Sequence, residues 1–201
     1  MIVIGLTGGT GAGKGTVCKI FSRYGINSID TDQTARSVCL PNKPCLIELI
    51  NYFGSSILNP DGSLNRPALA DAAFSSKEKH RMLNTITHKH ILAEVRLWLE
   101  EQKKSQKIAA IVDAPLLFES GFDKECDIII SVTAPTESRK QRIIERDSLS
   151  DFQAEQRMSK QHPDKFYTDK SHFVITNTGS LSDLNKQIDV IFNSLLKNGS
   201  V

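Results

Sequence analysis

The stretch Met1-Ile-Val-Ile-Gly-Leu-Thr-Gly-Gly-Thr-Gly-Ala-Gly-Lys14 decides the fold of this 201-residue chain. Residues 1–6 form a short apolar run, which predicts a strand buried on both faces of a parallel sheet. Residues 8–14 match the pattern G-x-x-x-x-G-K, whose glycines let the backbone curl around a phosphate with its N–H groups pointing inward. Because the pattern follows a predicted strand and precedes a predicted helix, it indicates a loop that binds the phosphates of a nucleotide.

The residue after the lysine departs from the common form of this loop. Lys14 can reach the terminal phosphates, but Gly15 stands where Ser or Thr usually supplies a hydroxyl to Mg²⁺. Thr16 carries the next hydroxyl, and one helical step of about 100° turns it toward the α-phosphate side. Mg²⁺ would then need water or acidic ligands elsewhere. This Gly-Lys-Gly-Thr form resembles adenylate-kinase-like small-molecule kinases more than GTPase switches.

Strands alternate with helices along the rest of the chain. Further strands are predicted at residues 26–29, 108–113, 127–132 and 173–176, and helices at 14–24, 44–53, 66–74, 77–103, 136–146, 151–160 and 181–196. This alternation predicts an α/β fold of the P-loop NTPase type, a parallel sheet with helices on both faces and right-handed crossovers. Two long stretches, residues 31–107 and 136–172, are interpreted as insertions that pack on this core.

Composition and charge limit the class of partner. Lys and Arg number 25 against 23 Asp and Glu, which leaves a net charge of +2 and favours neither a nucleic acid nor a membrane surface. The four cysteines form no C-x-x-C pair, which fits reduced thiols in cytosol. With no secretory segment and no apolar run of about 20 residues, the sequence predicts a soluble intracellular protein.

Three aspartates follow predicted strands, at the edge where open α/β sheets bind ligands. Asp30 and Asp32 follow the second strand and would face the same way if the strand geometry persisted. We assign Asp30 to capping the helix after residue 32 and Asp32 to orienting an attacking hydroxyl. Asp113 is the last residue of the third strand. In P-loop NTPases an acid at this position holds Mg²⁺ directly or through water.

Arg139, Arg142 and Arg146 are spaced by 3 and 4 residues, so on a helix they form one stripe. Such a stripe could close over a triphosphate as a lid and neutralise charge at the transferred phosphoryl group. The alternative is a solvated helix face. Residues 139–172 mix basic and acidic side chains, which favours individually placed arginines over non-specific attraction.

Five motifs, taken together, carry a family resemblance over nearly the whole chain. They are Ile4-Gly-Leu-Thr-Gly-Gly-Thr-Gly-Ala-Gly-Lys14, Gly25-Ile-Asn-Ser-Ile-Asp-Thr-Asp32 with Ala35-Arg36, Leu83-Asn-Thr-Ile-Thr-His88, Pro115-Leu-Leu-Phe-Glu119 and Val174-Ile-Thr-Asn177. In type and order they resemble the motifs of dephospho-CoA kinases, which complete coenzyme A synthesis by ATP-dependent phosphorylation of the ribose 3′-hydroxyl.

The resemblance implies one domain over residues 1–201, with a core of residues 1–32, 106–136 and 173–201, a helical acceptor region of residues 33–105 and a helical lid of residues 137–172. It implies ATP as co-substrate, Mg²⁺ as cofactor, dephospho-CoA as acceptor and a cytoplasmic location, for a monomer or small homo-oligomer. The residue roles it implies, together with the metal candidates above, are as follows: Asp32, Lys14 and Arg142 are catalytic; Gly11, Ala12, Gly13, Lys14, Gly15 and Thr16 bind the ATP phosphates; Asn177 lies near adenine; His88, Pro115 and Leu116 border the acceptor; and Asp113, through water, and Thr16 are metal candidates.

The chain departs from the family's pattern at three places: Gly15 replaces the usual Ser, Lys89 stands where Pro often follows the His, and Ser171-His172 replaces a small-acidic pair.

Two other functions stay open. Another small kinase, for nucleoside monophosphates or small metabolites, could use the same loop and arginine lid. A nucleotide switch would hydrolyse ATP without phosphorylating an acceptor, although the guanine-reading N-K-x-D signature is absent from the sequence.

Overall fold

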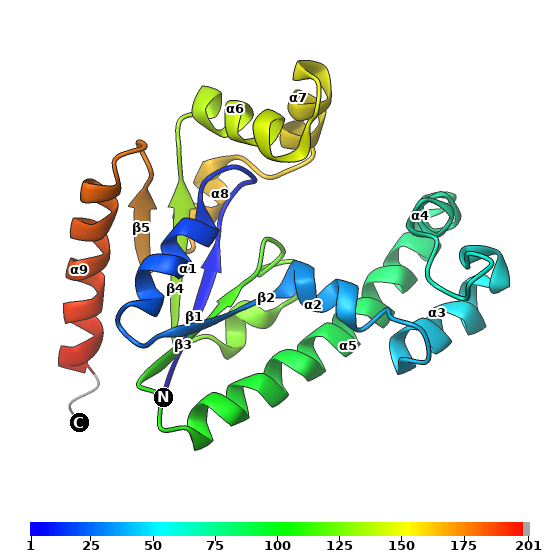
Figure 1. Ribbon diagram of the computed structural model, residues 1–201, viewed down its shortest axis with the longest axis horizontal. Helices are drawn as coiled ribbons and strands as arrows, with labels where there is room; N and C mark the ends of the chain where they lie inside the picture. Colours follow the sequence, from blue (N-terminus) through cyan, green and yellow to red (C-terminus); the bar gives the residue numbers. More distant parts are fainter. Residues whose placement is uncertain (199–201) are drawn as a thin grey trace. The chain divides into compact units, whose positions relative to one another are not determined.

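Five strands form one sheet in the order β2-β3-β1-β4-β5 in the computed structural model, which describes residues 1–198 (Figure 1). The strands are β1 (Ile2–Thr7), β2 (Asn27–Asp30), β3 (Ala109–Asp113), β4 (Ile128–Thr133) and β5 (Phe173–Thr176). β1 pairs in parallel with β3 and β4, and β4 pairs in parallel with β5. The strand order reverses direction around β1, so the loop that follows β1 lies where open α/β sheets bind their ligands.

The predicted parallel α/β architecture is confirmed, and each predicted strand is present to within one residue at either end. The predicted helices are also present, as α1 (Lys14–Ser22), α3 (Pro44–Phe53), α4 (Arg66–Phe74), α5 (Lys77–Lys104), α6 (Thr136–Asp147), α7 (Asp151–Ser159) and α9 (Leu181–Asn198). Four short elements had not been assigned as segments: α2 (Thr31–Ser37), α8 (Asp164–Thr168) and the 3-10 helices η1 (Ser55–Ile57) and η2 (Phe122–Glu125).

Apolar side chains cover both faces of the sheet. Ile4 and Leu6 of β1 are fully buried in one cluster with residues of α1 and α9. Gly5 points to the opposite face, where a Cβ would lie 2.8 Å from the Leu117 side chain. The segment between β3 and β4 therefore packs so closely on this second face that β1 has room only for glycine there.

The chain divides into two compact units. One consists of residues 1–29 and the chain from Leu99 onward, and the other of Asp30–Trp98. The second unit has its own core, in which Leu49 of α3, Leu69 of α4 and Ile86 of α5 are buried together. It overlaps the predicted acceptor region, whose function stays a prediction. Residues 199–201, at the end of the predicted core segment 173–201, lie outside the described residues.

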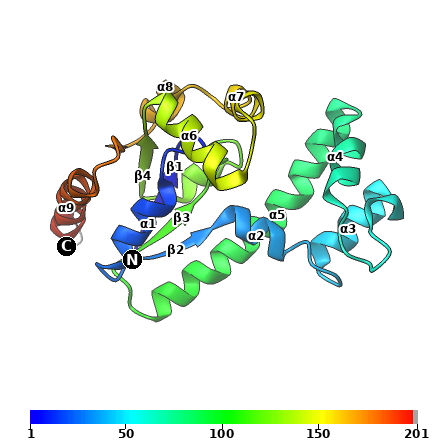
Figure 2. The same cartoon turned by 45° about the horizontal axis from the view of Figure 1, so that its top comes forward.

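Figures 1 and 2 show β1 and β4 pointing toward the end of the sheet at which α6, α7 and α8 lie. The loop between β1 and α1 is at this end, together with the segments that follow β3 and β4. Within the described part of the chain, the structure contains no helix long and apolar enough to cross a membrane.

Candidate active site

The glycine-rich loop joins the end of β1 to the start of α1 and depends on two glycines in the left-handed region. Gly11 has φ +75°, and Gly13, the N-cap of α1, has φ +103°. A Cβ on Gly13 would lie 2.2 Å from the Asn177 Nδ2 atom, so a side chain is excluded there by both strain and space. The first turn of α1 contains no acidic residue, which suits a helix N-terminus that receives an anion.

Side chains bind the loop's carbonyl groups from outside. Arg142 Nη1 donates to the Gly11 carbonyl over 3.1 Å, and Asn177 Nδ2 donates to the Ala12 carbonyl over 2.8 Å. Because a trans peptide directs its C=O and N–H to opposite sides, these contacts turn the N–H groups of the following residues away from Arg142 and Asn177. This arrangement is compatible with a backbone that binds phosphate, and the phosphate-binding role of the loop stays a prediction.

Lys14, Arg142 and Asn177 all lie at this loop. Lys14 begins α1 and its Nζ donates to the Gly8 carbonyl over 3.0 Å, which folds the side chain back along the loop. Arg142 Nη2 also donates to Asn177 Oδ1 over 3.4 Å, so these two side chains support each other as well as the loop. Asn177 is buried and its Oδ1 accepts from the Gly179 N–H.

The three arginines of α6 have different partners and do not form one anion-binding stripe. Arg139 is buried, and its Nη1 forms an ion pair with Asp164 Oδ1 at 2.6 Å. Arg146 is largely exposed and pairs with Asp147, whose pKa is lowered chiefly by that hydrogen bond. Arg142 is half-buried beside the loop and, unlike Arg139, has no carboxylate partner within the described part of the chain.

Asp113 is half-buried at the end of β3, in register with Leu6 of β1. Its Oδ2 lies 4.0 Å from the Cys18 Sγ, so the carboxylate faces α1, the helix that carries Thr16. Over the described residues, no three His, Cys, Asp or Glu side chains gather into a metal-binding group. One carboxylate beside a phosphate loop suits Mg²⁺, which is usually held by one or two carboxylates, substrate phosphates and water.

In the second unit, Asp30 caps α2 as predicted. Its Oδ1 accepts from the N–H groups of Asp32 and Gln33 at 2.8 and 3.1 Å. The condition under which Asp30 and Asp32 would face the same way is not met, because β2 ends at Asp30 and α2 begins at Thr31. Asp32 is instead an exposed residue in the first turn of α2.

The apolar residues that follow β3 differ in their exposure to solvent. Leu117 is fully buried, whereas Leu116 is 53% exposed and Pro115 is half-buried. Phe118 packs edge-on against Phe166 of α8, with ring centroids 5.6 Å apart. Leu117 and Phe118 thus hold the segment in place, and the exposed Leu116 side chain is accessible to a ligand.

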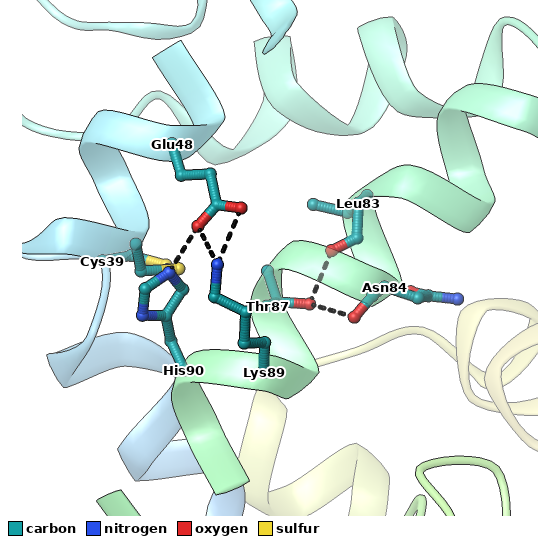
Figure 3. Close-up of polar contacts among 8 residues, drawn as sticks. Cys39, Glu48, Leu83, Asn84, Thr87, Lys89 and His90 are labelled. Carbon is teal, nitrogen blue, oxygen red and sulfur yellow. Dashed lines mark hydrogen bonds and ion pairs between the residues drawn. The ribbon is translucent and has the colours of Figure 1, made fainter. Parts of the chain in front are cut away.

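Figure 3 shows a polar cluster that joins α3 to α5 within the second unit. The Glu48 carboxylate accepts from Lys89 Nζ at 2.7 Å and lies 2.8 Å from His90 Nε2, and these hydrogen bonds lower the pKa of Glu48. Lys89, one of the three departures from the family pattern, therefore has a structural partner. His88, which is predicted to border the acceptor substrate, is half-buried on α5.

The thiols of Cys39 and Cys45 lie 3.6 Å apart, and Figure 3 shows Cys39 beside this cluster. The hydrogen bond between them lowers the pKa of Cys39 to about 7. None of the four cysteines, all of which lie in the described part of the chain, forms a disulfide. The pair packs into the second unit's core with Val38 and Leu49.

His172 explains another departure. The His172 ring Nδ1 accepts a hydrogen bond from the Ile129 N–H at 3.0 Å, and the His172 backbone N–H donates to the Ile129 carbonyl at 2.9 Å. The ring nitrogen supplies the acceptor that an acidic side chain could supply at this position. The backbone hydrogen bond extends the pairing of β4 with β5 by one residue.

Sequence reasoning did not single out Gln161 or Asp164, although both contact the loop or its supports. The Thr10 N–H donates to Gln161 Oε1 at 2.7 Å, across 151 residues of sequence. Nothing in a lone glutamine between two short helices signals such a contact.

The fold and the loop define the class of protein. A parallel sheet whose first strand leads into a G-x-x-x-x-G-K loop and a helix is the architecture of P-loop nucleotide-binding proteins, a class that includes small-molecule kinases. Shikimate kinase from Acinetobacter baumannii shares this fold, with a TM-score of 0.53 and 18% identity over 100% of this chain and 96% of that chain.

The sequence narrows this class to one family. The dephospho-CoA kinase family model matches residues 2–183. A dephospho-CoA kinase from Corynebacterium efficiens is 38% identical over 196 residues, covering 98% of both chains, and one from Moorella thermoacetica is 40% identical over 90% of this chain and 86% of its own length. The chain belongs to the dephospho-CoA kinase family, whose enzymes use ATP to complete coenzyme A biosynthesis.

Solved structures agree with this assignment. TT1252 from Thermus thermophilus superimposes with a TM-score of 0.81 and 30% identity, covering 96% of this chain and 97% of that chain. The dephospho-CoA kinase from Campylobacter jejuni gives a TM-score of 0.70 and 28% identity, with 98% of both chains covered. The enzyme class, an ATP-dependent transferase, follows from membership of this family.

Proposed function

We propose that this chain transfers the γ-phosphate of ATP to the ribose 3′-hydroxyl of dephospho-CoA, with the phosphate loop as the element that binds ATP and Asp32 as the residue that orients the hydroxyl. The observation that carries the proposal is the loop itself: Arg142 and Asn177 bind the carbonyls of Gly11 and Ala12 from outside. A preorganised set of N–H donors stabilises phosphate charge without reorganising during the reaction.

Lys14 and Arg142 are proposed to neutralise the phosphates. Both donate to loop carbonyls, at 3.0 and 3.1 Å respectively, so two cationic groups lie at the loop proposed to receive the phosphates. The backbone N–H groups of residues 11–16 form the rest of the binding site. Asn177 supports the loop from behind, and its predicted position near adenine stays part of this proposal.

Asp32 is proposed to accept the hydrogen bond of the attacking hydroxyl and hold it in line with the γ-phosphate. The Asp30 carboxylate fixes the first turn of α2 by capping it, so the backbone that carries Asp32 is held in place. Phosphoryl transfer through a loose transition state depends chiefly on such positioning.

Asp113 is the proposed holder of Mg²⁺, directly or through water, with Thr16 as a second oxygen donor on α1. Mg²⁺ bound there would neutralise charge on the phosphates. His88, Pro115 and exposed Leu116 are proposed to border the acceptor. We also propose a cytoplasmic location, which the four free cysteines support, for a monomer or small homo-oligomer.

An acceptor panel tests this function. Purified protein with ATP and Mg²⁺ should phosphorylate dephospho-CoA in preference to nucleoside monophosphates or shikimate, with one ADP formed for each phosphorylated acceptor. Turnover on a nucleoside monophosphate but not on dephospho-CoA would show that the proposed acceptor is wrong and that the protein is another small-molecule kinase. ADP formation without any phosphorylated acceptor would indicate a nucleotide switch.

A further inference from the structure

Thr10, at the outer bend of the phosphate loop, has both of its backbone polar groups bound by side chains from a distant part of the chain. Its N–H donates to Gln161 Oε1 at 2.7 Å, and its carbonyl accepts from Arg139 Nε at 3.0 Å. Gln161 lies between α7 and α8, and Arg139 lies on α6. The loop is therefore held at this point by the segment predicted to be the lid.

Arg139 is committed to this role by its surroundings. It is buried, and its charge is compensated by Asp164 at the start of α8, with Nη1 to Oδ1 at 2.6 Å. A buried guanidinium needs such a partner, because an unpaired charge away from water is strongly destabilising. Arg139 thus differs from Arg142, whose partners are loop carbonyls and Asn177.

Two glycines make the contact possible. A Cβ on Gly9 would lie 2.2 Å from Arg139 Nη2, and a Cβ on Gly11 would lie 2.5 Å from the Arg139 carbonyl oxygen. The loop backbone therefore packs directly on Arg139.

We propose that Arg139, Gln161 and Asp164 form a clasp that sets the conformation of the phosphate loop at Thr10 and couples it to the α7–α8 segment. These three are positioning residues, because they act on bound ATP through the loop backbone. The proposal rests on the proposed function only in naming ATP as the ligand of the loop. It assigns a role to Gln161 and Asp164, which neither the sequence motifs nor the family resemblance supplies.

The clasp predicts a selective effect of Gln161→Met, which keeps the length of the side chain and removes the acceptor for the Thr10 N–H. We expect the dissociation constant of a non-hydrolysable ATP analogue, measured by calorimetry, to rise about two- to tenfold, the range that corresponds to one hydrogen bond. The KM for dephospho-CoA should stay unchanged, and amide exchange at Thr10, followed by NMR, should become faster.

Gln156→Met is the matched control, since Gln156 is exposed on the neighbouring helix α7. It should leave the analogue affinity and the exchange of Thr10 unchanged. If Gln161→Met behaves like Gln156→Met in both measurements, the clasp does not position the loop. If Gln161→Met lowers the melting temperature strongly and weakens ATP and acceptor parameters alike, the role is structural and the proposal is again wrong.

A second pair of variants tests the ion pair. Asp164→Asn leaves Arg139 without its compensating carboxylate and should weaken analogue binding, whereas Lys165→Ala removes an exposed neighbour that pairs with Asp169 and should not. Equal analogue affinity in these two variants would remove Asp164 from the clasp. Binding of the analogue needs no acceptor, so these results stand apart from whether dephospho-CoA is the substrate.

Discussion

Gly15 gives the sharpest prediction, because the structure shows that nothing requires a glycine there. Its φ is not in the left-handed region, a Cβ would meet no atom within 4 Å, and the residue is exposed. It lies in the first turn of α1, where glycine carries a larger entropic cost than any residue with a side chain. Gly15 is also the position at which the family resemblance calls for serine.

Two substitutions separate helix stability from metal chemistry. Gly15→Ala should stabilise the protein by about 0.5–1 kcal/mol, the usual difference between these residues in a helix. For a domain of about 200 residues this raises the melting temperature by about 1–4 °C. Gly15→Ser should gain roughly half as much, since serine is the weaker helix former.

The Mg²⁺ dependence of turnover then distinguishes the two variants. The serine hydroxyl can donate an oxygen to Mg²⁺ beside the phosphates, so Gly15→Ser should lower the Mg²⁺ concentration needed for half-maximal activity, whereas Gly15→Ala should not. Melting curves without nucleotide and Mg²⁺ titrations of the steady-state rate measure both effects. Lower melting temperatures in both variants would refute the structural reasoning, and identical Mg²⁺ curves would refute the proposed place of the metal.

Three further predictions concern single side chains. Asp30→Ala should cost about 1 kcal/mol of unfolding free energy through loss of the α2 cap, and Asp30→Asn, which retains an acceptor, should cost little; equal losses in urea unfolding would exclude the cap. Glu48→Gln should cost less than about 1 kcal/mol at pH 7. Because Lys89 and His90 lower the Glu48 pKa, this contribution is present above the carboxyl's ordinary pKa of 4.5 and disappears as the pH falls through the lowered value, so a difference that persists at pH 2 would contradict it. Asn177→Ala should weaken binding of an ATP analogue in calorimetry, since a buried support of the loop is lost, and unchanged affinity would contradict that role.

The sequence predicted the regular elements well, because their signals are local. The continuous apolar run of residues 1–6 indicates a buried strand, the spacing of Leu184, Ile188 and Ile191 shows the helical period, and β1 and α9 lie where expected. α2 and α8 are short, and each buries a single residue, Thr34 or Tyr167. A five- to seven-residue helix with one buried side chain has no period to detect.

The site was predictable where one motif carries it and not where distant segments meet. Glycines and Lys14 identify the loop, because phosphate binding imposes that local pattern. The three arginines of α6 look equivalent in sequence, and only their tertiary partners separate buried Arg139 from Arg142 and exposed Arg146. The strand order and the contact from Gln161 to Thr10 depend on long-range packing, which residue spacing does not encode.

Asp32→Asn tests the central claim most directly, because it replaces the orienting carboxylate with an amide of nearly the same shape. We expect kcat with dephospho-CoA to fall by about 10²–10⁴-fold, while calorimetry shows the affinity for an ATP analogue unchanged. A variant that keeps the turnover of the unchanged protein, or that loses ATP binding in proportion to its turnover, would contradict that claim.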